Sequence, residues 1–246
     1  MPLAMQGTAG RSIVLESPDV FGFHALQGAG PEEAEAFRRL MQPVPGEEPT
    51  VDFLTHTAMD ALVASDEIKR VAGRFSDTAT YPRDPFSVKL RLVSELIAAG
   101  APTRVYYVGL GGFDTHAAQA GRHDRLLEQT GAGLDAFVRD LSQKGLLDRV
   151  LVITFSEFGR RVAENASAGT DHGAAAPMFL IGGAVKPGIH GTHPSLADLD
   201  QGDLKFQTDF RAVYATVLDR WMGVASQGIL GGHFTAVDVI KPRSAD

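Results

Sequence analysis

Three stretches of the chain repeat their hydrophobic residues every three or four positions, the spacing of an amphipathic helix. Helices are therefore expected over residues 50–68, 88–97 and 210–221. The last stretch has Thr208 as its predicted N-cap and Gly223 as its predicted end, and both residue types are typical of these positions.

Two short runs that are apolar on both faces flank a longer helical pattern. Arg104–Leu110 and Val150–Phe155 predict buried strands, and Arg122–Lys144 predicts the helix that joins them. Strands of this kind, when joined by a helix, are usually parallel neighbours in one sheet. A further strand is expected at Met178–Ile181, where the chain can return as an antiparallel neighbour. The pattern therefore favours an α/β fold.

The amino-terminal segment carries weaker signals. Residues 1–48 are rich in Gly and Pro and predict irregular structure, with a short extended stretch at Ser12–Leu15 and a short helix at Pro31–Met41. The first residues form neither a basic segment nor an apolar stretch of signal-peptide length, so no export signal is expected in this chain. A length of 246 residues suits one large domain or two small ones.

Composition narrows the possible functions. Lys and Arg number 23 against 30 Asp and Glu, a net charge of −7, and this lacks the basic excess that nucleic-acid binding needs. No apolar run approaches the roughly 18 residues of a membrane span, so no membrane span is expected. The absence of cysteine excludes disulfides, thiolate nucleophiles and thiolate zinc sites.

Polar clusters follow both predicted strands of the central unit. Gly-Gly-Phe-Asp-Thr-His ends at His116, and Ser-Glu-Phe-Gly-Arg ends at Arg160. Ligands of open α/β sheets bind at the carboxyl ends of the strands, so these clusters are the first candidates for chemistry. Asp114 and His116 are two positions apart, and in an extended segment their side chains point to the same side. That geometry suits a metal ion.

A third cluster, Gly-Thr-Asp-His-Gly, precedes the expected strand at Met178 and reaches the same edge if that strand is antiparallel. Five candidate metal ligands then converge: Asp114, His116, Glu157, Asp171 and His172. Carboxylate and imidazole ligands without thiolate suit Zn²⁺, Mn²⁺ or Fe, and are too rich in nitrogen for Ca²⁺. Arg160 is a candidate for binding the oxyanion of a substrate.

Each cluster alone also has an ordinary structural interpretation. Asp114 can be a turn residue, Glu157 and Arg160 can form a local ion pair at a helix start, and Asp171 and His172 can be solvated loop residues. Three such clusters placed independently at one edge favour the metal site over these alternatives.

These motifs, together with Thr-Asp-Phe-Arg at 208–211, resemble the carboxyl-terminal part of a bacterial family, domain of unknown function 1501, best over residues 86–223. The resemblance implies membership of the alkaline phosphatase and sulfatase superfamily. Its fold is a three-layer α/β/α sandwich with a mostly parallel sheet, here spanning residues 1–246 as one domain. Such a domain binds one or two divalent ions, Zn²⁺ or Mn²⁺ being favoured, and hydrolyses phosphate or sulfate esters of small molecules or glycans.

Carried over by motif, Asp114 and His116 match one ligand pair, and His172, with Asp171 beside it, matches a late histidine ligand. Glu157 stands where the superfamily usually has an Asp-His pair, so that match is partial. In the superfamily a metal-activated Ser or Thr attacks the ester, but no residue of this chain is assigned that role.

The chain departs from the family pattern at its start, because the Gly-Gly-Asn-Asp-Gly type of segment that opens the family is missing. We therefore expect a truncated family member, or one whose amino-terminal half comes from another polypeptide. Family members are often exported by the twin-arginine route, which implies a periplasmic or secreted location, or a cytoplasmic one if this chain is complete. Two other functions stay open: a non-catalytic binding or scaffold module, and a metal-dependent phosphomutase-type enzyme.

Overall fold

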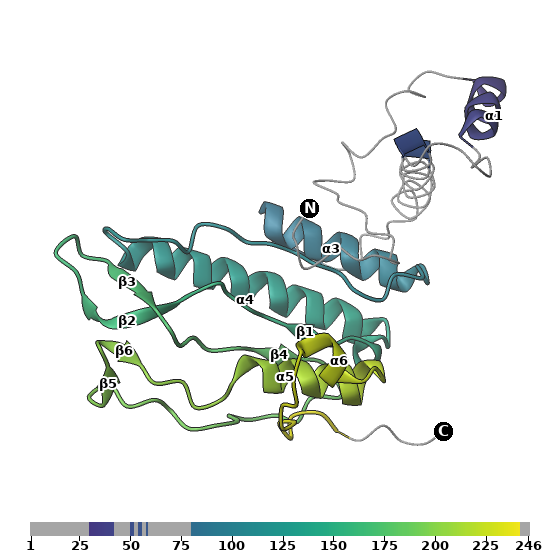
Figure 1. Ribbon diagram of the computed structural model, residues 1–246. Helices are drawn as coiled ribbons and strands as arrows, with labels where there is room; N and C mark the ends of the chain where they lie inside the picture. Colours follow the sequence, from purple (N-terminus) through teal and green to yellow (C-terminus); the bar gives the residue numbers. More distant parts are fainter. Residues whose placement is uncertain (1–29, 42–49, 52–53, 56–57, 59–79, 242–246) are drawn as a thin grey trace. The chain divides into compact units, whose positions relative to one another are not determined.

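The computed structural model describes residues 30–41, 50–51, 54–55, 58 and 80–241 (Figure 1). The chain divides into two compact units, residues 1–109 and 110–246. The extended stretch expected at Ser12–Leu15 and most of the helix expected over residues 50–68 lie outside the described residues.

Two helices of the first unit confirm their predictions. Helix α1 spans Pro31–Leu40 and helix α3 spans Pro85–Ala98. The Asp84 carboxylate accepts hydrogen bonds from the backbone amides of Phe86 and Ser87 at 3.0 Å, and Pro85 occupies the first helical position. This cap satisfies amide groups that have no partner inside the helix, which explains why α3 begins there.

The structure differs from the prediction at Arg104–Leu110, where a buried strand was expected. No strand is assigned to this stretch, and Val105 and Tyr107 are 50% and 40% exposed. Valine and tyrosine favour strands, but a strand forms only where a neighbour completes its hydrogen bonds and covers its side chains. The prediction of a strand over this stretch was therefore wrong.

The second unit contains the long helix that the sequence predicts. Helix α4 spans Ala120–Gln143 and is followed by a short 3₁₀ turn, η3, at Leu147–Arg149. Phe137 and Leu141 are buried, whereas Leu127, near the start of the helix, is 51% exposed. The buried part of α4 is therefore its carboxyl-terminal half. No helix among the described residues is both long enough and apolar enough to cross a membrane.

In the described part of the chain, six short strands form three separate two-stranded sheets. β1 (Val152–Ile153) pairs with β4 (Leu180–Ile181), β2 (Gly159–Glu164) with β3 (Thr170–Gly173), and β5 (Leu199–Asp200) with β6 (Asp203–Leu204). All three pairs are antiparallel. The α/β class is thus confirmed, as is the antiparallel return of the chain after residue 178, while the mostly parallel sheet and the three-layer sandwich stay predictions.

A hydrophobic cluster anchors the β1–β4 pair. Val217, Val239 and Ile240 are buried at its centre, and Ile153 and Leu180 from the two strands pack against them. The pairing of β1 with β4 lies close to helix α5 in Figure 1. The β2–β3 hairpin lies between β1 and β4 in the chain, so both of its ends lead to strands that this cluster holds.

The final helical region also follows its prediction, with one shift. Helix α5 spans Phe210–Thr216, continues as a π-helical segment, η4, at Val217–Met222, and precedes helix α6 at Ser226–Leu230. Gly223 ends η4 in the left-handed conformation, with φ at 67°, as expected. The N-cap, however, is Asp209, whose carboxylate accepts a hydrogen bond from the Arg211 amide at 2.8 Å, and not Thr208.

Candidate metal site

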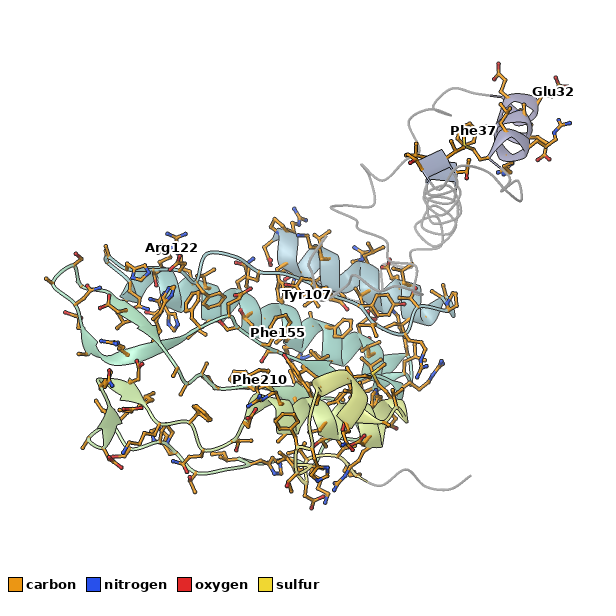
Figure 2. All side chains as sticks on the ribbon, viewed as in Figure 1. Glu32, Phe37, Tyr107, Arg122, Phe155 and Phe210 are labelled. Carbon is orange, nitrogen blue, oxygen red and sulfur yellow. The ribbon has the colours of Figure 1, made fainter. Side chains whose placement is uncertain are left out.

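A β-hairpin packs against the loop that precedes α4, and the two together carry the candidate site. In the β2–β3 ladder Arg160 stands directly opposite His172. At the hairpin tip the Gln119 amide donates a hydrogen bond to the Ala168 carbonyl at 2.9 Å, which joins the tip to the start of α4 (Figure 1). Arg122, labelled in Figure 2, lies in the first turn of α4, just after this loop. Residues some fifty positions apart in the sequence thus become neighbours.

Three of the five predicted ligands come together at this junction. The Asp114 Oδ1 atom lies 2.8 Å from Nε2 of His172 and 2.9 Å from Nε2 of His116. The two imidazole rings are 4.8 Å apart between centroids. Among the described residues, this is the group whose donor atoms are close enough together to hold one metal ion. The side chains are 63% (Asp114), 50% (His116) and 44% (His172) exposed, so the site is open to solvent.

The electrostatics of the site favour an ionised carboxylate. The hydrogen bond with His172 is the largest of the effects that lower the pKa of Asp114 below its usual value, and the neighbouring His116 adds to it. A carboxylate accepts hydrogen bonds more strongly when it is ionised, which is why such contacts favour the charged form. Asp114 is therefore ready to act as an anionic ligand.

The other two predicted ligands are placed differently. Asp171 Oδ1 lies 3.8 Å from Nδ1 of His116, on the other side of that ring from Asp114. The Asn165 side-chain amide donates to the His116 carbonyl at 3.1 Å and to Asp171 Oδ1 at 3.3 Å. Glu157 is exposed and does not belong to the group of three donors.

Arg160, predicted to bind substrate, is engaged by the protein itself. Its Nη1 donates to the Thr170 carbonyl at 2.5 Å, and its Nη2 donates to the Phe113 carbonyl at 2.5 Å and to Thr115 Oγ1 at 3.5 Å. The guanidinium also lies 4.9 Å from the centre of the Phe158 ring. Arg161, its neighbour on β2, pairs instead with Asp203 at 3.3 Å.

Two residues that shape the site were missed by the sequence interpretation. Phe158 stacks face to face on His172, with ring centres 3.8 Å apart and planes 5° from parallel. Asn165 holds the hairpin turn, because its side-chain oxygen accepts from the amides of Ser167 and Gly169. The segment Asn-Ala-Ser-Ala-Gly between two polar runs is a hairpin signal that identifies this turn.

The three donor side chains suit a divalent ion of the first transition row or Zn²⁺. Two imidazoles and one carboxylate, without thiolate, suit Zn²⁺, Mn²⁺ or Fe, and three protein ligands leave at least one coordination position for water or substrate.

A hollow lined by Asp200, Lys205 and Phe206 beside the β5–β6 hairpin includes none of the predicted site residues.

The fold and the site define an α/β domain with a possible metal-binding triad on a hairpin and its neighbouring loop. The chain belongs to the family described as Protein of unknown function (DUF1501), which matches residues 29–231. No curated protein and no solved structure matches it.

Proposed function

We propose that the chain is a metal-dependent, hydrolase-type α/β domain that acts on phosphate or sulfate esters. The observation that carries the proposal is the meeting of Asp114, His116 and His172 around one point. The resemblance of the three motifs to the alkaline phosphatase and sulfatase superfamily supports the reaction class. It also supports a three-layer α/β/α core, a small-molecule or glycan ester as substrate, and a periplasmic or secreted location.

Three side chains would hold the ion, Zn²⁺ or Mn²⁺, through the two Nε2 atoms and the Asp114 carboxylate. Lewis-acid stabilisation of the negative charge that develops on ester oxygens is the chemistry that a bound ion supplies. The protein's own part is to keep Asp114 ionised and to hold both rings toward it. The open side of the triad leaves room for an ester to approach.

Asp171 is suited to orient the His116 ring or to serve as a ligand of a second ion. It faces Nδ1 of His116, and a carboxylate in that position fixes the ring so that Nε2 points toward a metal. The assignment of Glu157 as a ligand stays a prediction, as does the contribution of an amino-terminal half from elsewhere.

Metal content tests the proposal directly. The purified chain is loaded with Zn²⁺ or Mn²⁺, dialysed, and assayed for bound metal beside D114A and H116A. We expect the chain to retain metal and both variants to lose it, because each variant lacks one of the three donors of the triad. D135A is the matched control, since Asp135 pairs with Arg139 on the exposed face of α4, outside the triad. Equal metal content in all four proteins would refute the site.

A non-catalytic binding module is the second candidate. The engagement of Arg160 by backbone carbonyls favours it, because a phosphoryl or sulfuryl group then lacks that guanidinium as a partner. Hydrolysis of p-nitrophenyl phosphate and p-nitrophenyl sulfate with Zn²⁺, Mn²⁺ or Mg²⁺ separates the two candidates. Metal-dependent release of p-nitrophenol supports the hydrolase, and metal retention without release supports the binding module.

A further inference from the structure

We infer that Arg160 and Phe158 are positioning residues that hold the metal triad together, and that Arg160 is not a substrate-binding residue. The inference rests on the proposed metal site, which it deepens. Phe158 directly precedes β2, and Arg160 is the second residue of that strand. Neither belongs to the donor set, but each contacts a segment that carries a ligand.

The guanidinium of Arg160 ties two segments that are otherwise distant in the sequence. Its acceptors on the loop, Phe113 and Thr115, stand on either side of Asp114. Its acceptor on β3, Thr170, lies two residues before His172. One side chain thus fixes the spacing between the loop ligand and the hairpin ligand.

Arginine suits this task better than lysine does. A planar guanidinium presents several donors in a fixed fork, so it can bind two carbonyl oxygens in different directions at once. A lysine ammonium is a compact charge on a flexible stem, with no such fixed geometry. If Arg160 turned toward a substrate, the carbonyls of Phe113 and Thr170 would each lose a hydrogen bond from a charged donor, which is stronger than one from a neutral donor.

Phe158 fixes the orientation of the imidazole. Its ring covers one face of His172, whose centre is 4.8 Å from that of His116. A stacked partner restricts rotation of the His172 ring and keeps Nε2 directed at Asp114. Gly159, between the two positioning residues, allows β2 to pass the backbone of Ala175, because a Cβ atom there would overlap the Ala175 carbonyl.

The test compares R160M and R160K with R161M. Arg161 is the matched control, because it is the next residue of β2 and pairs with Asp203 instead of the loop. Zn²⁺ affinity is measured by competition with a chromophoric chelator, and amide hydrogen exchange of the loop is measured in metal-free protein. Removal of a partner that orients metal ligands typically weakens metal binding by about 10–100-fold.

We expect R160M to lose affinity within that range and to exchange the Thr115 amide faster, since this amide donates to the Phe113 carbonyl that Arg160 holds. R160K should show the same defects in smaller measure, and R161M should behave as the parent chain. Where R160M fails to fold, as judged by circular dichroism, R160K and F158L decide the question. F158L should weaken Zn²⁺ binding, because it keeps an apolar side chain and removes the stacked ring.

Two results would overturn the inference. One is parental Zn²⁺ affinity and parental loop exchange in R160M with a raised KM for the ester, which would make Arg160 a substrate-binding residue. The other is an equal loss of Zn²⁺ affinity in R161M, which would show that the effect comes from removing a positive charge and not from the contacts of Arg160. If the parent chain binds no metal, the proposed function fails, and the exchange of the Thr115 amide still decides whether Arg160 positions the loop.

Discussion

Replacement of Gly169 by alanine tests the contact on which the candidate site depends. A Cβ atom at Gly169 would stand 2.8 Å from the backbone nitrogen of Ala117 and closer still to the His116 carbonyl. Ordinary contact begins at 3.4 Å, so the hairpin and the loop must separate by at least 0.6 Å, the difference between the two distances. The neighbours are backbone atoms, which no side-chain rotation can move aside.

The expected consequence is weaker metal binding, since His116 and His172 lie on the two segments that are forced apart. Loss of ligand positioning typically weakens binding by about 10–100-fold, and a comparable loss of Zn²⁺ affinity is expected for G169A. The assay is chelator competition, with the melting temperature measured in parallel without metal. G169A should also unfold at a lower temperature than the parent chain.

Gly131 supplies the matched control. It lies inside α4, and a Cβ atom there would have nothing within 4 Å. Alanine favours helices over glycine by about 0.5–1 kcal/mol, so G131A should be slightly more stable and bind metal as the parent does. Parental Zn²⁺ affinity and stability in G169A would show that the hairpin tip does not touch the loop at His116, and the reasoning about the site would fail.

Two further predictions concern the framework around the site. L141A should lower the free energy of unfolding in urea by about 2–5 kcal/mol, because Leu141 is fully buried, whereas L127A on the same helix should change it by less than about 0.5 kcal/mol. Equal effects would contradict the burial of the carboxyl-terminal half of α4. A hydrogen bond from Lys186, together with one from Arg220, lowers the pKa of Asp238. The ionised Asp238 carboxylate therefore stabilises the fold at pH values above the usual carboxyl pKa. This stabilisation is lost as the pH falls through the lowered pKa of Asp238. D238N should therefore melt at a lower temperature at neutral pH and show a weaker loss of stability on acidification, a difference that thermal melts from neutral to acidic pH would reveal or refute.

The helices were predictable from the sequence because their signals are local. The 3.6-residue spacing located α3 and α4, and Gly223 marked the end of η4. Strands depend on partners, which a single sequence does not identify. Arg104–Leu110 has the residue types of a buried strand but forms none, and only two residues of Val150–Phe155 enter a ladder.

The sequence predicted which residues meet at the candidate site, but not the contacts that bring them together. Asp114, His116 and His172 meet as expected, although not at an edge of parallel strands. The hairpin register brings His172 opposite Arg160, and the contact of the hairpin tip with Gln119 brings the loop alongside. Glu157 was included because it follows β1, but the chain turns there before β2 begins and leaves its side chain exposed.

The Asp114, His116 and His172 side chains are roughly half exposed, and this exposure favours rapid binding and release of a metal ion. An ion enclosed in a protein interior is released only when the surrounding structure opens. Around this triad a chelator can reach the coordination shell directly from water. Exchange of one metal for another should then proceed in the folded protein within ordinary mixing times, with occupancy following the metals available in the surrounding solution.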